Sequence, residues 1–88
     1  MSVNEYIGAV VIVLGAATTE ARALIAKKGA GEEFWHVLRK ARKAHAVLKN
    51  ALDVSGPAVN AQTRRYVDEM GAALKQLEML AARTRFAH

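Results

Sequence analysis

The sequence has 88 residues, no cysteine, one proline and six glycines, and 13 lysines and arginines against 8 acidic residues give a formal charge of +5. A chain of this length forms a single domain, predicted to span residues 1–88, and it is too small to enclose a large catalytic cleft. The lack of cysteine excludes disulfides, thiolate metal sites and a cysteine nucleophile. Together these features predict a soluble, cytoplasmic protein that binds no cofactor and no metal.

The first predicted helix covers about residues 2–28. Its apolar residues alternate at steps of four and three, as on one face of an α-helix: Val3, Ile7, Val10, Leu14, Ala17, Ala21 and Leu24. Lys27 and Lys28 follow in the last turn, where cations suit the negative end of the helix dipole, and Gly29 comes next as a helix-ending residue. The pattern therefore predicts both the helix and its C-terminal end.

The second and third predicted helices cover about residues 32–52 and 58–86, separated by the helix-breaking stretch 53–57. The second repeats Phe34, Leu38, Ala41, His45, Leu48 and Leu52. The third repeats Val59, Thr63, Tyr66, Met70, Ala73, Leu77, Leu80 and Thr84. No strand pattern competes, and connections of three to five residues make neighbouring helices antiparallel. The sequence thus predicts an all-α protein whose three antiparallel helices form a small bundle, completed by oligomerisation.

The first helix is apolar on every side over residues 9–17, which read AVVIVLGAA. A helix of this kind must be covered all round, and a three-helix unit has no central position that could do so. The uncharged run of 14 residues from Tyr6 to Thr19 is shorter than a membrane span, and Glu5 precedes it without any lysine or arginine, unlike a secretory signal. We therefore expect no spanning segment, and a second copy of the same chain as the cover.

A stripe of small residues on the first helix suggests how two copies could approach closely. Ala9, Ala16 and Ala23 recur every seventh residue, with Gly8 and Gly15 beside the first two. With Ile12, these residues form the predicted oligomer interface. The alternative is that the stripe packs against another helix of the same chain.

The second helix carries a basic face that we predict to bind a partner. The face comprises Trp35, Arg39, Arg42, Lys43 and Lys49, and Arg64 and Arg65 of the third helix are predicted to extend it. An acidic protein surface would complement it. The alternative is nonspecific nucleic-acid binding, in which the cations hold phosphates and the indole stacks on a base. A further alternative for Trp35 is that the end of another helix covers it.

The inventory of reactive groups does not favour an enzyme. Ser2 and Ser55 are the only serines, no glycine-rich loop follows a strand, and no pair of acids lies on a predicted seam. His45 lies on the seam of the second helix, where a histidine typically packs and hydrogen-bonds to a neighbouring helix. We therefore expect a regulatory or interaction protein without a small-molecule substrate.

Overall fold

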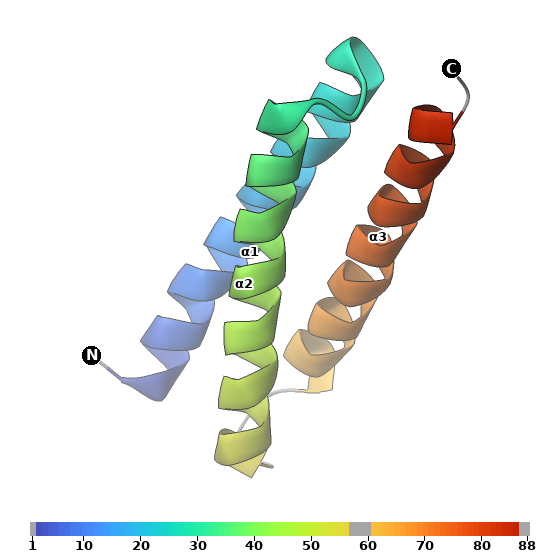
Figure 1. The fold of residues 1–88 in the computed structure, drawn as a ribbon. Coiled ribbons are helices and arrows are strands. Elements are labelled where there is room, and N and C mark those ends of the chain that lie inside the picture. Colours follow the sequence, from blue (N-terminus) through green and yellow to red (C-terminus); the bar gives the residue numbers. More distant parts are fainter. Residues whose placement is uncertain (1, 57–60, 87–88) are drawn as a thin grey trace.

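The computed structural model describes residues 2–56 and 61–86 and shows a small all-α bundle of three helices. The helices are α1 (Val3–Lys28), α2 (Glu32–Ser55) and α3 (Ala61–Phe86). Figure 1 shows them side by side along their length, in a body with extents of 48 × 20 × 16 Å. The predicted fold class and helix number are confirmed.

The ends of α1 follow from local chemistry. The Glu5 backbone N–H donates to the Ser2 hydroxyl at 3.1 Å, so a serine caps the N-terminus, and Glu5 places a negative charge in the first turn. At the other end Lys27 and Lys28 occupy the last turn, as predicted. Gly29 then adopts φ 78°, a backbone conformation that residues with a Cβ rarely adopt, and its N–H donates to the Ile25 carbonyl.

The end of α2 differs from the prediction. The helix continues through Asp53 and Val54 to Ser55, three residues past the predicted end, and stops where Gly56 takes φ 60° and its N–H donates to the Leu52 carbonyl. Asp53 and Ser55 do not end the helix, because Asp and Ser are tolerated in a last turn. The helix ends at Gly56, which adopts the positive φ typical of a C-terminal cap. The predicted start of the third helix at 58 falls on residues 57–60, outside the described residues.

The core is built from one stripe on each of α1 and α2, as predicted. In α1 the buried members are Ile7, Leu14, Ala17 and Ala21. In α2 they are Phe34, Leu38, Ala41, Leu48 and Leu52, joined by Val37 and Ala44 toward one side. Several of these side chains are alanines, and α1 and α2 form the most extensive helix contact of the bundle.

The buried stripe of α3 is rotated from the predicted one. Leu77 is buried as predicted, but the other buried residues are Val67, Leu74 and Ala81, which the prediction left out, and Leu80, predicted on the seam, is 45% exposed. Apolar residues of α3 occupy a wide arc, so two neighbouring stripes both satisfy the helical spacing. The stripe that is buried is the one that places Val67 and Leu74 in the common core of the bundle.

The contacts between α2 and α3 occur in opposite order along the two helices. Arg64 at the start of α3 meets the end of α2, His45 meets Val67 in the middle, and Arg42 meets Glu78 farther along. α3 lies against one side of the α1–α2 pair. Among the described residues no helix covers the opposite side of that pair, and the exposed apolar surface of α1 lies there.

Candidate interaction surfaces

The outward side of α1 exposes large apolar side chains. Ile12 is 73% exposed, Tyr6 44% and Val13 43%, and Gly8, Ala9, Ala16 and Ala23 are exposed as well. Burying such side chains would contribute about 25 cal/mol for each Å² removed from water. We call this surface, defined by Tyr6, Ala9, Ile12, Val13 and Ala16, the open face of α1.

A groove runs beside the open face, between α1 and α2. Its volume is about 290 Å³. Tyr6, Val10 and Val13 line it from α1, and Lys40, Lys43, Ala44 and Val47 from α2. The groove is therefore apolar at its floor and positively charged on its α2 rim.

The predicted small-residue interface divides between two sides of α1. Gly8, Ala9, Ile12, Ala16 and Ala23 are exposed, as an interface with another molecule requires. Gly15 points elsewhere, because a Cβ placed on it would lie 3.0 Å from the hydroxyl oxygen of Tyr66 in α3. The prediction for Gly15 is therefore wrong. This glycine permits close packing of α1 against α3 within one chain.

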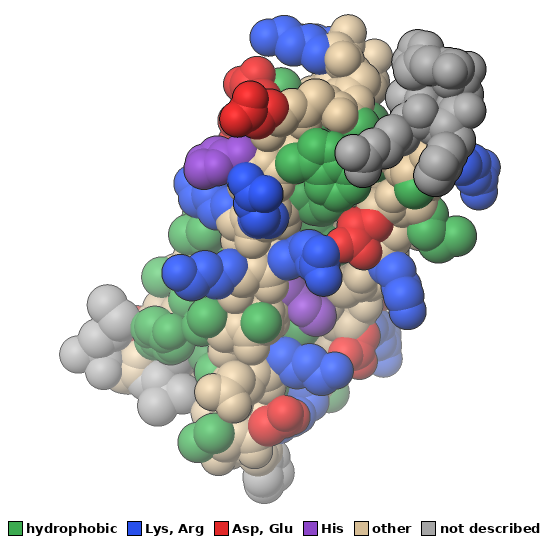
Figure 2. Space-filling model, viewed as in Figure 1, with side chains coloured by type: hydrophobic (Ala, Val, Ile, Leu, Met, Phe, Trp, Pro, Cys, Tyr) green, Lys and Arg blue, Asp and Glu red, His purple; other side chains and the backbone are tan. Residues whose placement is uncertain are grey.

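Part of the predicted basic face is open to solvent. Arg39, Lys43 and Lys49 are exposed on α2, and so is Lys40, which the prediction left out of the partner-binding set. On the side drawn in Figure 2, lysine and arginine side chains are spread along the molecule with acidic side chains between them. Hydrophobic side chains gather at the lower left, where Figure 1 places the N-terminal half of α1.

Two predicted members of the basic face contact other residues of the same chain. Arg42 forms an ion pair with Glu78 of α3, so its charge is partly neutralised. Trp35 is half-buried against the core, and its ring meets that of Phe34 edge to face with centroids 5.3 Å apart. The indole is thus a packing residue in the first instance. Both lie on the side of α2 that turns toward α3, which sequence spacing alone did not indicate.

Arg64 of α3 does not extend the basic face. The Arg64 guanidinium donates to the carbonyls of Leu52, at 3.2 Å, and of Gly56, and so binds the C-terminal end of α2. A cation there also complements the helix dipole. Arg65 is exposed, but one residue along a helix is a turn of 100°, so it points away from the α2 contact made by Arg64.

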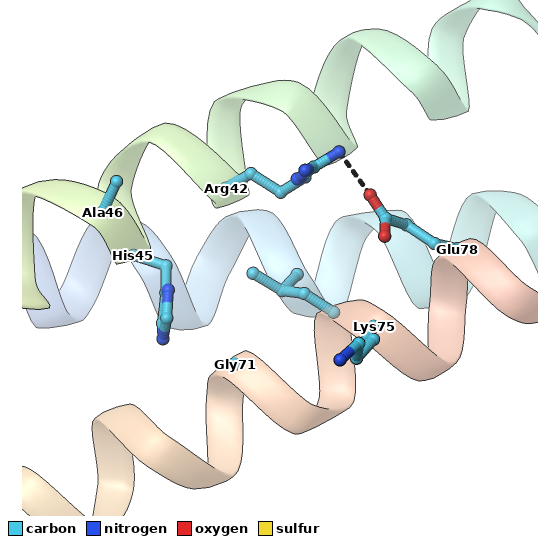
Figure 3. A pocket seen from close by; sticks show the side chains of 7 residues that line it. Arg42, His45, Ala46, Gly71, Lys75 and Glu78 are labelled. Atoms are coloured by element: carbon cyan, nitrogen blue, oxygen red, sulfur yellow. Dashed lines mark ion pairs between the residues drawn. The ribbon is translucent and has the colours of Figure 1, made fainter.

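A hollow of about 330 Å³ lies between α2 and α3 (Figure 3). Arg42, His45 and Ala46 line it from α2, and Gly71, Leu74, Lys75 and Glu78 from α3. The Arg42–Glu78 ion pair crosses one end.

The His45 ring is already engaged in packing at this hollow. Its Nε2 lies 3.0 Å from the Val67 carbonyl oxygen, to which it donates. A Cβ on Gly71 would lie 2.6 Å from the same nitrogen, so only glycine leaves room for the ring. The predicted role of His45, a packed residue bonded to the next helix, is confirmed.

The open face was anticipated in part, and the groove beside it was missed. The run of apolar residues in 9–17 indicated an uncovered surface, but Tyr6, Val10 and Lys40 did not enter the predicted interface. Their signal was available: Tyr6, Val10 and Val13 are spaced by four and three residues and so share one edge of the helix. What could not be read from spacing is that this edge borders two lysines of α2.

The stretch Asn4–Lys28 of α1 is long and apolar enough to cross a membrane: its most apolar 18-residue stretch has a mean hydropathy of 1.7, and 22% of that stretch is buried. Signal sequences and the core helices of soluble proteins reach the same length and hydropathy, so these properties do not identify what covers the open face. Among residues 2–56 and 61–86, no three His, Asp or Glu side chains are grouped to hold a metal ion. Comparison with protein-family models, curated proteins and solved structures found no match.

Proposed function

We propose that this chain is a non-enzymatic interaction protein that self-associates through the open face of α1 and presents the basic side of α2 to an acidic protein surface. One observation carries the proposal. Ile12, Val13 and Tyr6 are substantially exposed on a helix of which no other part of the described chain covers the outward side. Exposed apolar surface of this kind is typical of an interface.

Self-association is tested by the molar mass in solution, measured by light scattering after gel filtration. The wild-type chain is expected at twice the chain mass or more. Ala16→Glu places a charge in the open face, so we expect monomer or insoluble protein. Ala72→Glu makes the same change at an exposed position of α3 and should leave the mass unchanged. A soluble Ala16→Glu oligomer of wild-type mass would contradict the proposal.

The basic side of α2 supports a partner of negative charge. Arg39, Lys43 and Lys49 are exposed there, and Lys40 lies beside them. Cations spread along a helix attract acidic surfaces over a distance of about 10 Å at ordinary ionic strength. The chain's net charge of +5 acts in the same direction.

Nucleic acid is the competing partner for these cations, and salt separates the two. A nucleic-acid binder releases counterions, so its affinity for a random duplex falls steeply between 50 and 200 mM salt. We expect only weak duplex binding at 150 mM salt, and purified protein whose ultraviolet absorbance does not change on nuclease treatment. If the chain instead binds the duplex tightly, and the triple variant Arg39→Ala, Lys43→Ala and Lys49→Ala does not bind it, the partner of the basic side is nucleic acid and not an acidic protein.

A further inference from the structure

The groove between α1 and α2 combines an apolar floor with a positively charged rim. Val10 and Val13 of α1 and Val47 of α2 line the floor, and Lys40 and Lys43 of α2 line the rim. Both lysines are exposed, and neither forms an ion pair within the described residues. The groove therefore offers an apolar contact together with two charges of the same sign along one side.

α3 shows how the other side of the same helix pair is covered. Its apolar residues join the core, and its Glu78 forms an ion pair with Arg42 of α2. On α2, Lys40 lies five residues before His45, which contacts α3, so Lys40 is turned about 140° away from that contact. A further helix can therefore occupy the groove while α3 stays in place.

The groove is about two helical turns long. Its lining runs from Tyr6 to Val13 on α1 and from Lys40 to Val47 on α2, which is about 10 Å at a rise of about 1.5 Å per residue. A helix that lies in such a groove anchors itself by apolar residues at positions i, i+3 or i+4, and i+7. Lys40 and Lys43 are about one turn apart, so they match two acids one turn apart on the flank of the entering helix.

The charges of α1 favour a protein over an anionic lipid surface as the occupant. Glu5 and Glu20 are exposed near the two ends of the apolar stretch of α1. At about 100° per residue, both point within about 40° of Ala16, in the open face. A membrane of anionic lipid lying against this side of the bundle would meet these two carboxylates, which it repels. A helix confined to the groove avoids them.

The groove and the self-association contact use different directions of α1. Val10 borders the groove. Ile12 and Ala16, exposed on the open face, point about 160° and about 120° away from Val10. Tyr6 and Val13 lie between the two directions. A second copy can therefore cover Ile12 and Ala16 while the groove remains accessible.

We propose that the groove between α1 and α2 binds an amphipathic helix of a partner protein, whose apolar residues contact the valines of the floor and whose flanking acids pair with Lys40 and Lys43. This proposal rests on the acidic partner proposed above and specifies its form and its place of binding. The partner helix and α3 then cover opposite sides of the α1–α2 pair, as in a four-helix bundle. Burial of the floor supplies affinity, and the two lysines discriminate against helices with basic flanks.

Three synthetic peptides with the same leucine stripe serve as probes, each about 21 residues long to allow helix formation. They differ only in the residues that flank the stripe, which are glutamate, glutamine or lysine. Fluorescence anisotropy of the labelled peptides measures their dissociation constants from the full chain at 50 mM and 500 mM salt. At 50 mM salt we expect the glutamate peptide to bind at least about tenfold more tightly than the lysine peptide, with the glutamine peptide between them. The difference should shrink at 500 mM salt.

Charge reversal on the rim tests the two lysines. In the double variant Lys40→Glu with Lys43→Glu, the preference is expected to invert, so that the lysine peptide binds at least about tenfold more tightly than the glutamate peptide. Lys75→Glu with Arg83→Glu makes the same change of net charge at exposed positions of α3 and should keep the wild-type preference.

A matched pair of valine substitutions tests the floor. Val47→Gln removes apolar surface from the groove, so we expect the glutamate peptide to bind about three- to tenfold more weakly. Val54→Gln makes the same change near the end of α2, where the valine is 81% exposed and lies outside the groove, and should bind like the wild type. Circular dichroism verifies that every variant is folded.

The outcomes distinguish this proposal from the proposed function. An inverted preference in the rim variant, together with weaker binding by Val47→Gln, supports the helix site. If Arg39→Glu with Lys49→Glu, on α2 outside the groove, weakens the glutamate peptide as much as the rim variant does, the groove is not the site and the acidic partner of the basic side stands. If no peptide binds, the helix site is overturned, and self-association is still decided by the molar mass of Ala16→Glu. If no peptide binds and the chain floats with vesicles of phosphatidylserine and phosphatidylcholine, a lipid surface replaces the acidic protein as well.

Discussion

At the scale of single residues, the His45 ring of α2 packs against Gly71 of α3 with no room for a Cβ on the glycine. Both sit in the middle of their helices, where glycine is unfavourable by about 1 kcal/mol relative to alanine. The glycine is retained at this cost because a Cβ would lie 2.6 Å from the imidazole Nε2. A glycine that lowers the helix propensity of α3 is therefore explained by His45, its neighbour on α2.

We predict that Gly71→Ala lowers the free energy of unfolding by about 1–2 kcal/mol, because the imidazole must move and its bond to Val67 is strained or lost. Urea denaturation at fixed protein concentration measures the change. In a His45→Ala background, the same glycine substitution should be neutral or stabilising, since the obstacle is gone. Equal effects in both backgrounds would mean that the His45 contact is not the reason for the glycine.

Arg64 is the second residue whose role depends on its neighbours. Its guanidinium joins the start of α3 to the last turn of α2 through the carbonyls of Leu52 and Gly56. We predict that Arg64→Ala costs about 1.5–3 kcal/mol of unfolding free energy, the value of hydrogen bonds from a charged donor. Arg65→Ala removes the same charge from an exposed neighbour and should change stability by less than about 0.5 kcal/mol. Similar losses from both variants would exclude the proposed binding of α2 by Arg64.

At the scale of elements, α3 shows that the spacing of apolar residues predicts a helix but does not always predict which face of it is buried. The stripes of α1 and α2 were predicted correctly. In α2 few apolar residues lie outside the stripe, so the choice of face is unambiguous, whereas in α1, which is apolar on every side over residues 9–17, the stripe is marked only by the four-and-three spacing over the whole helix. In α3, Tyr66, Ala73 and Leu80 form one edge of a wide arc and Val67, Leu74 and Ala81 the other. Spacing alone allows either edge, and the choice is made by the shape of the α1–α2 surface.

The register of α3 is tested by a matched pair of leucine substitutions. Leu74 is 4% exposed, so Leu74→Ala should leave a cavity and cost about 2–4 kcal/mol. Leu80 is 45% exposed, and Leu80→Ala should cost less than about 1 kcal/mol. Thermal and urea unfolding compare the two. If Leu80→Ala lowers the free energy of unfolding more than Leu74→Ala does, the buried stripe of α3 is the one predicted from the spacing of its apolar residues.

The predicted interaction residues fared less well than the helices, for a physical reason. Long cationic side chains can bend toward whichever acid or carbonyl the fold brings near, as Arg42 does toward Glu78 and Arg64 toward Gly56. Those neighbours come from another helix and depend on its register, which spacing within one helix does not contain. Exposure of Ile12, by contrast, follows from its own helix being apolar on all sides.

At the scale of the whole molecule, the α1–α2 pair is covered by a third helix on one side only. α1 and α2 form a close pair, α3 covers one side of it, and the side that bears Tyr6, Val13 and Val47 has no cover among the described residues. A chain of this size has little apolar burial to spare, so leaving part of α1 exposed is costly unless another molecule covers it. Self-association would make the stability of each copy depend on the other.

That dependence gives the last prediction. If two copies cover the open face of α1, the melting temperature of the wild-type chain should rise with protein concentration, because dilution favours the less stable monomer. A hundredfold increase in concentration adds about 2.7 kcal/mol per mole of dimer to the folded state, which corresponds to several degrees for a chain of this length. Differential scanning fluorimetry over that range measures the shift. Ala16→Glu should melt at a lower temperature that does not vary with concentration, whereas Ala72→Glu should follow the wild type. A wild-type melting temperature that stays constant over the hundredfold range would mean that each copy is stable alone, and the exposed side of α1 would then have to be a surface for a different molecule.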